Sequence, residues 1–325
     1  MGLAGEVACW PMFPIRRWTG SSVPFAQQGA KALGPSSWMK GFDMTKPNPI
    51  VIMAAGKGSR MKAAALVSEW EKEEAATRPK AMIRIGRAKR PLLHHLVEQC
   101  VEEGMKDICV VVAEDDRVTA PHFRLHPVPG AAMDFVVQRI APGRTKPNGT
   151  AEAVQLALHA HPDWEGCHIA VANGDNLPPK GLLERMLLHP SCLPAMDANH
   201  LGLPADRVRA FAVIHRTADG KLAHIEEKPS PSAIESCRWP DGSIRVSMNC
   251  FRMAYADLRN AVEQAAEHPT RKERELPAAI SSWNQAHPGV LTVLPLAGAF
   301  LDLTHPQDIQ KAGVALDAGG HRIRN

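Results

Sequence analysis

The sequence IVIMAAGKGSRM, at residues 50–61, joins an apolar run to a glycine-rich basic loop. Its first half contains no polar residue, which is typical of a parallel strand covered on both faces. Gly56 and Gly58 let backbone amides approach a ligand closely, and successive amides form a concave anion site. Lys57 and Arg60 add positive charge at the same place. The segment therefore indicates a strand that leads into a phosphate-binding loop.

The loop matches neither of the two common glycine-rich phosphate motifs. The dinucleotide fingerprint requires a third glycine where this chain has Met61, and the P-loop requires a Gly-Lys-Ser/Thr ending. A glycine pair after a strand is also compatible with a simple tight turn. A nicotinamide-dependent dehydrogenase is therefore a distant alternative.

The segments that follow alternate between strand and helix patterns. Apolar residues recur at helical spacing between Pro91 and Val101, and residues 107–113 read as a strand. Gly104 then ends the predicted helix. This strand–loop–helix–strand order indicates an α/β fold.

Composition and charge exclude several classes of protein. The 325 residues include 38 Lys and Arg against 34 Asp and Glu, a net charge of +4. That balance is unsuited to a dedicated nucleic-acid-binding face, so we expect no nucleic-acid partner. No apolar run approaches the length of a membrane helix, so we expect no membrane partner.

The cysteines and histidines do not form a recognisable metal or disulfide pattern. The seven cysteines are scattered and odd in number, which indicates reduced thiols in a cytoplasmic protein. His122 and His126 stand four apart, but Pro121 and Pro127 flank them, so we expect no helical metal pair there. The sequence leaves open whether the protein forms a homo-oligomer.

Residues 1–43 differ from the rest of the chain. They hold three of the seven tryptophans, are rich in Gly, Pro and Ser, and show no periodicity. Arg16-Arg17 is followed by polar residues, so a twin-arginine signal is not expected. We interpret Met44 as the natural start and residues 1–43 as an irregular, non-native extension; the alternative is a disordered arm that docks on a partner. Residues 44–325 are predicted to form a single domain.

Longer stretches of the sequence resemble a known family. Together with residues 50–61, TRPKAMIRIG at 77–86 and RPLLHHLVEQCVEEGMKDICVVV at 90–112 resemble the N-terminal half of the sugar-phosphate nucleotidyltransferases, in particular the glucose-1-phosphate thymidylyl- and uridylyltransferases. The resemblance implies a Rossmann-like, doubly wound mixed sheet. It also implies that the loop binds the nucleotide through Ala54, Ala55, Gly56, Gly58 and Ser59.

Two later segments extend the resemblance on the nucleotide side, which we place at about residues 48–180. NGTAEA at 148–153 matches the segment that receives the base, with Gly149 and Thr150 against the nucleotide and Gln138 reading the pyrimidine edge. Asp175, which follows the strand-like residues 168–172, stands at the position of the magnesium aspartate.

The sugar side, at about residues 181–312, carries the remaining matches. FAVI at 211–214 and IEEKP at 225–229 match the sugar-binding strand and its Glu-Lys-Pro turn. By resemblance, Glu227 would accept hydrogen bonds from sugar hydroxyls and Lys228 would hold the sugar phosphate. Asp302, in GAFLD at 298–302, would be the second magnesium ligand.

The implied reaction joins a sugar 1-phosphate to the α-phosphorus of UTP or dTTP and releases pyrophosphate. The nucleophile is already an anion, so catalysis consists of positioning and charge neutralisation. Arg60 would stabilise the leaving pyrophosphate, Lys80 would bridge it to the α-phosphate, and Lys228 would hold the attacking phosphate. Mg²⁺ on Asp175 and Asp302 would orient the α-phosphate.

The sequence departs from the family at four places. Arg60 and Lys80 are twenty residues apart, about twice the usual spacing, and the added residues 62–76 predict a helix. That helix is either a solvated surface element or a lid anchored by Trp70. Three positions where the family usually has glycine are occupied by larger residues, which puts glucose in doubt as the sugar: Ala212 and Asn249 on the sugar side, and Thr304 after Asp302.

Other functions remain open at this stage. The chain ends without the hexapeptide-repeat domain of the ADP-glucose and N-acetylglucosamine enzymes, which we take to disfavour those relatives. Within the class, the alternative is a cytidylyltransferase acting on a phosphorylated alcohol. From a different class, the alternative is a non-catalytic nucleotide-sugar sensor with the same fold.

Overall fold

The computed structural model describes residues 46–56, 58, 68–319 and 321–323. The predicted extension at residues 1–43, and Ser59 and Arg60 of the glycine loop, lie outside the described residues. No helix in the described ranges is both long and apolar enough to cross a membrane.

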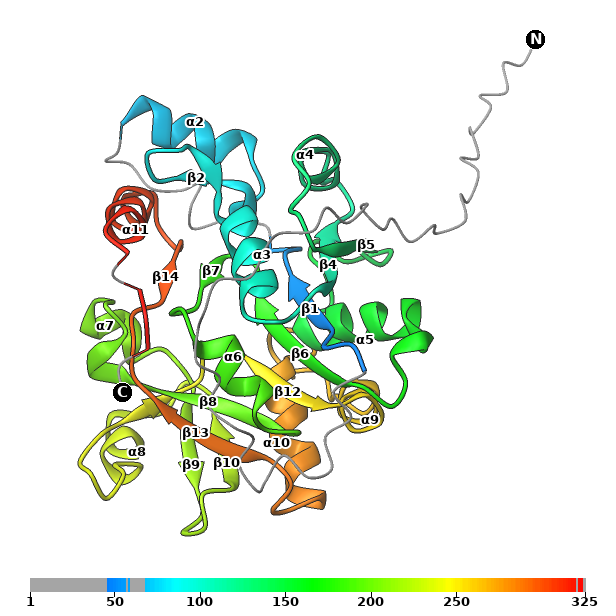
Figure 1. Cartoon of the computed structure of the whole chain (residues 1–325). Coiled ribbons are helices and arrows are strands. Elements are labelled where there is room, and N and C mark those ends of the chain that lie inside the picture. The colour runs from blue at the N-terminus through cyan, green and yellow to red at the C-terminus, as the bar shows by residue number, and fades with distance from the viewer. Residues whose placement is uncertain (1–45, 57, 59–67, 320, 324–325) are drawn as a thin grey trace, which may run out of the picture.

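A ten-stranded mixed sheet runs through the centre of the molecule (Figure 1). Its strand order is β10 (Leu222–Glu226), β9 (Val213–Arg216), β11 (Arg245–Val246), β8 (Cys192–Asp197), β12 (Phe251–Ala254), β6 (His168–Asn173), β1 (Ile50–Met53), β4 (Asp107–Ala113) and β5 (Ala132–Gln138). β13 (Thr292–Leu296) pairs with β8 outside this path. The strands β6, β1, β4 and β5 are parallel, whereas β8 to β12 pair in antiparallel fashion.

Strand β1 is covered on both faces, as its unbroken apolar sequence predicts. Ile50 and Ile52 belong to the same buried cluster as the apolar side of α3 (Leu92–Glu102). Val51 and Met53 belong to a second cluster, which includes α5 (Thr150–Ala160). Because successive strand residues point to opposite faces, this alternation places β1 between two layers of helices. The predicted Rossmann-like, doubly wound α/β fold is confirmed.

The remaining helices divide between these two layers. The layer of α3 includes α6 (Leu182–Leu187) and α11 (Gln307–Asp317), and the layer of α5 includes α9 (Tyr255–Glu263) and α10 (Leu276–Ala286) (Figure 1). Smaller elements lie around the sheet: α2 (Glu69–Thr77), α4 (Thr119–Leu125), α7 (Ala205–Val208) and α8 (Pro231–Ser236), and the paired short strands β2 (Arg84–Ile85) with β3 (Arg90–Pro91) and β7 (Asn176–Leu177) with β14 (Leu301–Asp302).

The predicted helix at residues 62–76 is confirmed for its described part. α2 begins after Ser68, which forms a capping box with Glu71. Its buried Glu74 accepts hydrogen bonds from Arg84, which anchors the helix to β2. Lys89 lies over the ring of Trp70, with Nζ 3.5 Å from the ring centroid.

One expectation about local structure is wrong. Prolines were expected to prevent a helix around His122, but α4 spans Thr119–Leu125. Pro121 falls in the first turn of this helix, where a backbone N–H has no helical partner in any case. The expectation of reduced thiols fits the structure, because the six described cysteines are free and buried.

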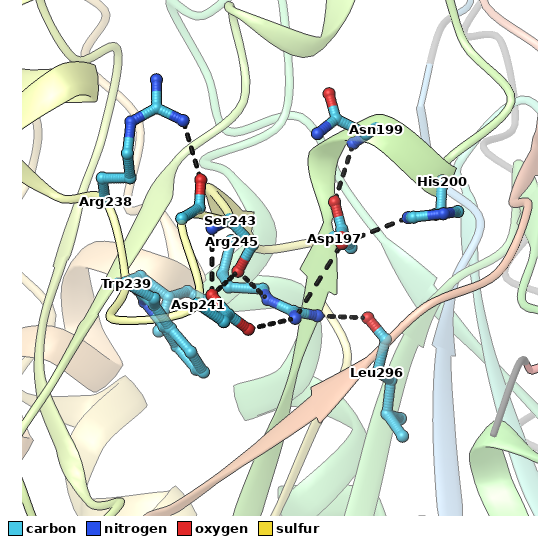
Figure 2. Close-up of polar contacts among 11 residues, drawn as sticks. Asp197, Asn199, His200, Arg238, Trp239, Asp241, Ser243, Arg245 and Leu296 are labelled. Atoms are coloured by element: carbon cyan, nitrogen blue, oxygen red, sulfur yellow. Dashed lines mark hydrogen bonds and ion pairs between the residues drawn. The ribbon is translucent and has the colours of Figure 1, made fainter.

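A buried arginine ties the antiparallel strands together (Figure 2). Arg245 on β11 donates hydrogen bonds to the Leu296 carbonyl of β13 at 2.9 Å and to Ser243 Oγ at 2.8 Å. Its Nη2 also lies 3.2 Å from Asp241 Oδ2 and 3.9 Å from Asp197 Oδ2 of β8. The guanidinium therefore neutralises carboxylates at the junction of three strands.

Replacing Arg245 with methionine is expected to lower the free energy of unfolding by about 3 kcal/mol, because buried Asp197 loses its cationic neighbour. Urea denaturation of the variant and the wild type measures the difference. Arg238→Met is the control, since Arg238 pairs with Glu235 at the surface and should cost less than about 1 kcal/mol. Equal losses in the two variants would contradict a structural role for the buried network.

Candidate active site

A cavity of about 540 Å³ opens at the carboxyl ends of β1, β5 and β6. This is the edge at which open parallel sheets bind ligands. Its lining consists of Met53, Ala54, Ala55, Gly56, Lys80, Ala81, Gln138, Lys146, Pro147, Gly149, Thr150, Ala153, Asn173, Asp175, Asn249, Glu273 and Glu275.

The structure brings most of the predicted site residues to this cavity. Those that line it are Ala54, Ala55, Gly56, Lys80, Gln138, Gly149, Thr150, Asp175 and Asn249. Those that are described but do not line it are Gly58, Ala212, Glu227, Lys228 and Asp302. Ala212 is buried within the core cluster of the α5 layer, so its side chain packs against protein. Gly58 has φ +60°, a conformation that favours glycine.

Lys80 and Asp175 form the charged centre of the cavity. Lys80 begins a short 3₁₀ helix at residues 80–82, whose other members, Ala81 and Met82, are buried and fix its position. The ammonium Nζ lies 2.5 Å from Asp175 Oδ2, and the two side chains are 15% and 32% exposed. A cation and a carboxylate thus face the same space at the end of β6.

Asp302 lies deeper beside this pair. It is buried on β14, and burial raises its pKa, an effect that Lys80 opposes and Asp175 reinforces. Arg207 and Thr304 both donate hydrogen bonds to Asp302 Oδ2, and Arg207 Nη1 lies 2.9 Å from Asp308 Oδ2. The sequence analysis missed Arg207, which no motif singles out and which lies 95 residues before its partner.

The oxygen groups here suit a hard divalent cation. Asp302 pairs in register with Asn176, which follows Asp175 directly, so the side chains of Asp302 and Asn176 share one face of the β7–β14 ladder. The Oδ1 atom of Asn176 is buried and has no hydrogen-bond partner among the described residues. Two carboxylates and an unpartnered amide oxygen form a donor set that matches Mg²⁺ better than a softer metal.

Gly149, which also lines the cavity, permits a close approach of two chain segments. Its φ is +101°, and a Cβ built there would lie 2.4 Å from the Arg274 carbonyl oxygen. Hydrogen bonds from Arg274 N to Asn148 O at 2.7 Å and from Ala151 N to Arg274 O at 2.9 Å join the segments. The glycine therefore holds the start of α5 against the segment that carries Glu273 and Glu275.

Replacing Gly149 with alanine is expected to lower the free energy of unfolding by about 3 kcal/mol, from a left-handed backbone and a clash with fixed backbone. Gly143→Ala is the matched control, because Gly143 has φ +79° with no atom within 4 Å of an added Cβ. It should cost only about 1 kcal/mol. Urea denaturation of both variants tests the difference, and equal costs would argue against the clash.

Gln138 is held in one orientation beside Gly149. Its Nε2 donates to the Gly149 carbonyl at 2.9 Å and to Glu152 Oε2 at 2.8 Å. Two acceptors thus engage both of its amide protons. The group that Gln138 can offer a ligand is consequently its acceptor, Oε1.

The sugar-side residues show two unusual backbone positions. Asn249, predicted to replace a glycine, has φ +56°, and asparagine is among the residues that best tolerate this region. Lys228 has φ +49°. The neighbouring Glu227 is partly buried, which raises its pKa, while Arg271 and Lys228 act in the opposite direction. Glu227 and Lys228 thus belong to a charged cluster beside the cavity.

A charged segment on the cavity wall escaped the sequence analysis. Glu273 and Glu275 line the cavity; Glu273 pairs with Lys146 at 2.5 Å and Glu275 with Arg271 at 3.1 Å. The alternating charges of RKERE at residues 271–275 were the available signal, but such runs are usually solvated. The approach of Arg274 to Gly149 and the ion pair between Lys146 and Glu273 hold this run at the cavity.

The fold and the cavity agree with the comparison to known families. The family model described as nucleotidyl transferase matches residues 50–290, and the chain belongs to this family.

Individual relatives carry several different names. The chain is 29% identical over 198 residues to the bifunctional protein GlmU of Sorangium cellulosum, covering 59% of this chain and 37% of that protein. It is 31% identical over 144 residues to a glucose-1-phosphate thymidylyltransferase of Mycolicibacterium smegmatis, and this match covers 43% of this chain and 45% of that protein. It is 23% identical over 197 residues to a glucose-1-phosphate adenylyltransferase of Nitrosospira multiformis, and this match covers 59% of this chain and 44% of that protein. The chain thus spans less than half the length of these curated relatives.

A solved structure supports the fold. It is that of a Bacillus anthracis protein assigned as a glucose-1-phosphate thymidylyltransferase, in complex with sucrose. The TM-score is 0.57 at 18% identity, and the match covers 82% of this chain and 94% of that one. Because a glucose-1-phosphate adenylyltransferase is among the relatives, the comparisons do not support our expectation that the ADP-glucose enzymes are disfavoured.

Proposed function

We propose that this chain transfers a nucleoside monophosphate from UTP or dTTP to a sugar 1-phosphate and releases pyrophosphate. The observation that carries the proposal is the convergence of Lys80, Asp175 and Asp302 at the carboxyl edge of the sheet, beside a cavity that Gln138 also lines. Family membership supports a transferase of this kind.

The chemistry follows from the charges around the cavity. The reacting groups are all anions, so the site must hold them together and neutralise the charge of the transition state. Lys80 is placed to contact the α-phosphate and the departing pyrophosphate. The backbone of Ala54, Ala55 and Gly56 receives the triphosphate at the end of β1. In the proposal Arg60 stabilises the leaving group.

A metal ion completes this arrangement. Asp175 and Asp302 would hold Mg²⁺, which supplies positive charge that orients and polarises the α-phosphate. Lys80 Nζ lies 2.5 Å from Asp175 Oδ2, so the lysine and the proposed metal ligand face the same space. In the proposal Lys228 holds the attacking phosphate and Glu227 binds sugar hydroxyls.

The orientation of Gln138 supports a uracil or thymine nucleotide. Both of its amide protons are bound by protein acceptors, so in the proposal its Oε1 accepts a hydrogen bond from the base. Uracil and thymine carry an N3–H that can donate to this acceptor. The buried free thiols support a reducing compartment such as the cytoplasm.

A pyrophosphate-release screen tests the proposal. UTP, dTTP, CTP, ATP and GTP are each combined with Mg²⁺ and a panel of sugar 1-phosphates that includes hexoses other than glucose. We expect release only with UTP or dTTP and a sugar 1-phosphate. Release with CTP and a phosphorylated alcohol would support the cytidylyltransferase, and nucleotide-sugar binding without any release would support the sensor.

A further inference from the structure

Three metal-ligating side chains that do not line the cavity gather on the sheet. His215 lies on β9, and His224 and Glu226 lie on β10. One ligand atom from each lies within 4.8 Å of those of the other two. Among the described residues, no other group of three or more His, Cys, Asp or Glu side chains meets this condition.

The strand register places these side chains together. β9 and β10 are antiparallel, and His215 pairs directly with His224 across a register shift that begins after Leu222. Glu226 is two residues beyond His224, so it points to the same face. The intervening Ile225 packs into the core of the α5 layer, and its N–H donates to Ser281 of α10. The three polar side chains therefore project from the opposite face of the sheet.

The ligand atoms of the cluster lie within reach of one metal ion. One ring nitrogen of His215 lies 3.2 Å from Glu226 Oε2, and ligands about 2.1 Å from a tetrahedral metal are themselves roughly 3.4 Å apart. The two imidazole rings stack with centroids 3.9 Å apart, so a ring must rotate about its side-chain torsions for both to point a nitrogen at one ion.

The surroundings limit the choice of ligands and ion. The sulfur of Cys237 is not among the ligand atoms that gather within 4.8 Å of one another. The guanidinium of the neighbouring Arg216 stacks on Trp239, with Cζ 4.1 Å from the ring centroid, so the indole ring holds this positive charge. The donors are thus two imidazole nitrogens and one carboxylate, with room for water as a further ligand.

We propose that His215, His224 and Glu226 form a binding site for a divalent transition metal, with Zn²⁺ as the expected ion. Two imidazoles and a carboxylate are a zinc donor set, whereas the oxygen groups around Asp175 suit Mg²⁺. The bound ion joins β9 to the edge strand β10, directly before Glu227. This site is separate from the proposed nucleotidyl transfer and does not depend on it.

Zinc titration of untagged, full-length protein tests the site. The protein is stripped with EDTA, dialysed, supplied with excess Mg²⁺ and titrated with ZnCl₂ in competition with a chromogenic chelator. We expect one Zn²⁺ per chain, and at least about tenfold weaker binding in both His224→Ala and Glu226→Gln. Circular dichroism checks that each variant is folded, and His215→Asn replaces any variant that is not.

Two control variants show whether the effect is specific. His122→Ala disrupts a second group of close histidines, in which His94 Nδ1 lies 3.0 Å from His122 Nε2, and His159→Ala removes a surface His–Glu pair. Both should bind Zn²⁺ like the wild type. The proposal is overturned if the wild type binds no Zn²⁺, if His224→Ala binds as tightly as the wild type, or if Glu226→Gln leaves the affinity unchanged.

Discussion

Replacing Lys80 with alanine is expected to lower kcat by about a hundredfold or more, as does the loss of a charged group that stabilises a transition state. Its ammonium group is held at the edge of the cavity by Asp175 and by the buried residues that follow it. Without this ammonium group, the negative charge that develops on the α-phosphate and the departing pyrophosphate loses the lysine that the proposal assigns to it. Initial rates of pyrophosphate release at saturating substrates measure the change.

A surface lysine provides the matched control. Lys180 also pairs with a carboxylate, Glu102 at 3.0 Å, but away from the cavity lining. Lys180→Ala should retain nearly full turnover. A folded Lys80→Ala protein with near-normal kcat would reject the role assigned to Lys80.

Asp302→Asn is expected to lower turnover by about a hundredfold and to raise the Mg²⁺ concentration needed for half-maximal activity. An amide is a weaker ligand than a carboxylate, and several kcal/mol of transition-state stabilisation depend on the metal. Activity measured across a Mg²⁺ titration gives both quantities.

The Asp302 result needs a control because Asp302 also pairs with Arg207. Asp308 shares Arg207 and in addition accepts hydrogen bonds from Thr304 N and His305 N. Asp308→Asn therefore perturbs the same ion-pair network without removing a proposed metal ligand, and its Mg²⁺ dependence should stay that of the wild type. Parallel shifts in both variants would mean that Asp302 acts only through Arg207.

The parts of the fold that the sequence predicted are those with local causes. Strand β1 could be predicted from its own residues, because an unbroken apolar run is typical of a parallel strand that is covered on both faces. Helix α3 carries its periodicity within eleven residues. Lys80, Asp175, Gln138 and Gly149 were predicted from the resemblance to the sugar-phosphate nucleotidyltransferases, and the structure brings all four to one cavity at the edge where parallel strands end.

The remaining features depend on contacts between distant segments. Arg207 approaches Asp302 because α7 packs beside β14, and neither residue carries a local sign of the other. The Arg274 backbone fills the space beside Gly149 from 125 positions away, so the need for glycine there has a cause that no motif records. His215 and His224 meet through a strand register that a bulge shifts. Neither composition nor spacing encodes such a shift.

Product stoichiometry tests the proposed activity most directly. Purified protein is incubated with Mg²⁺ and UTP or dTTP, with and without a sugar 1-phosphate, and pyrophosphate and nucleotide-sugar are quantified by chromatography. The account predicts equal amounts of the two products, formed only when sugar 1-phosphate is present. Pyrophosphate released without the sugar phosphate, or nucleotide bound without either product, would contradict it.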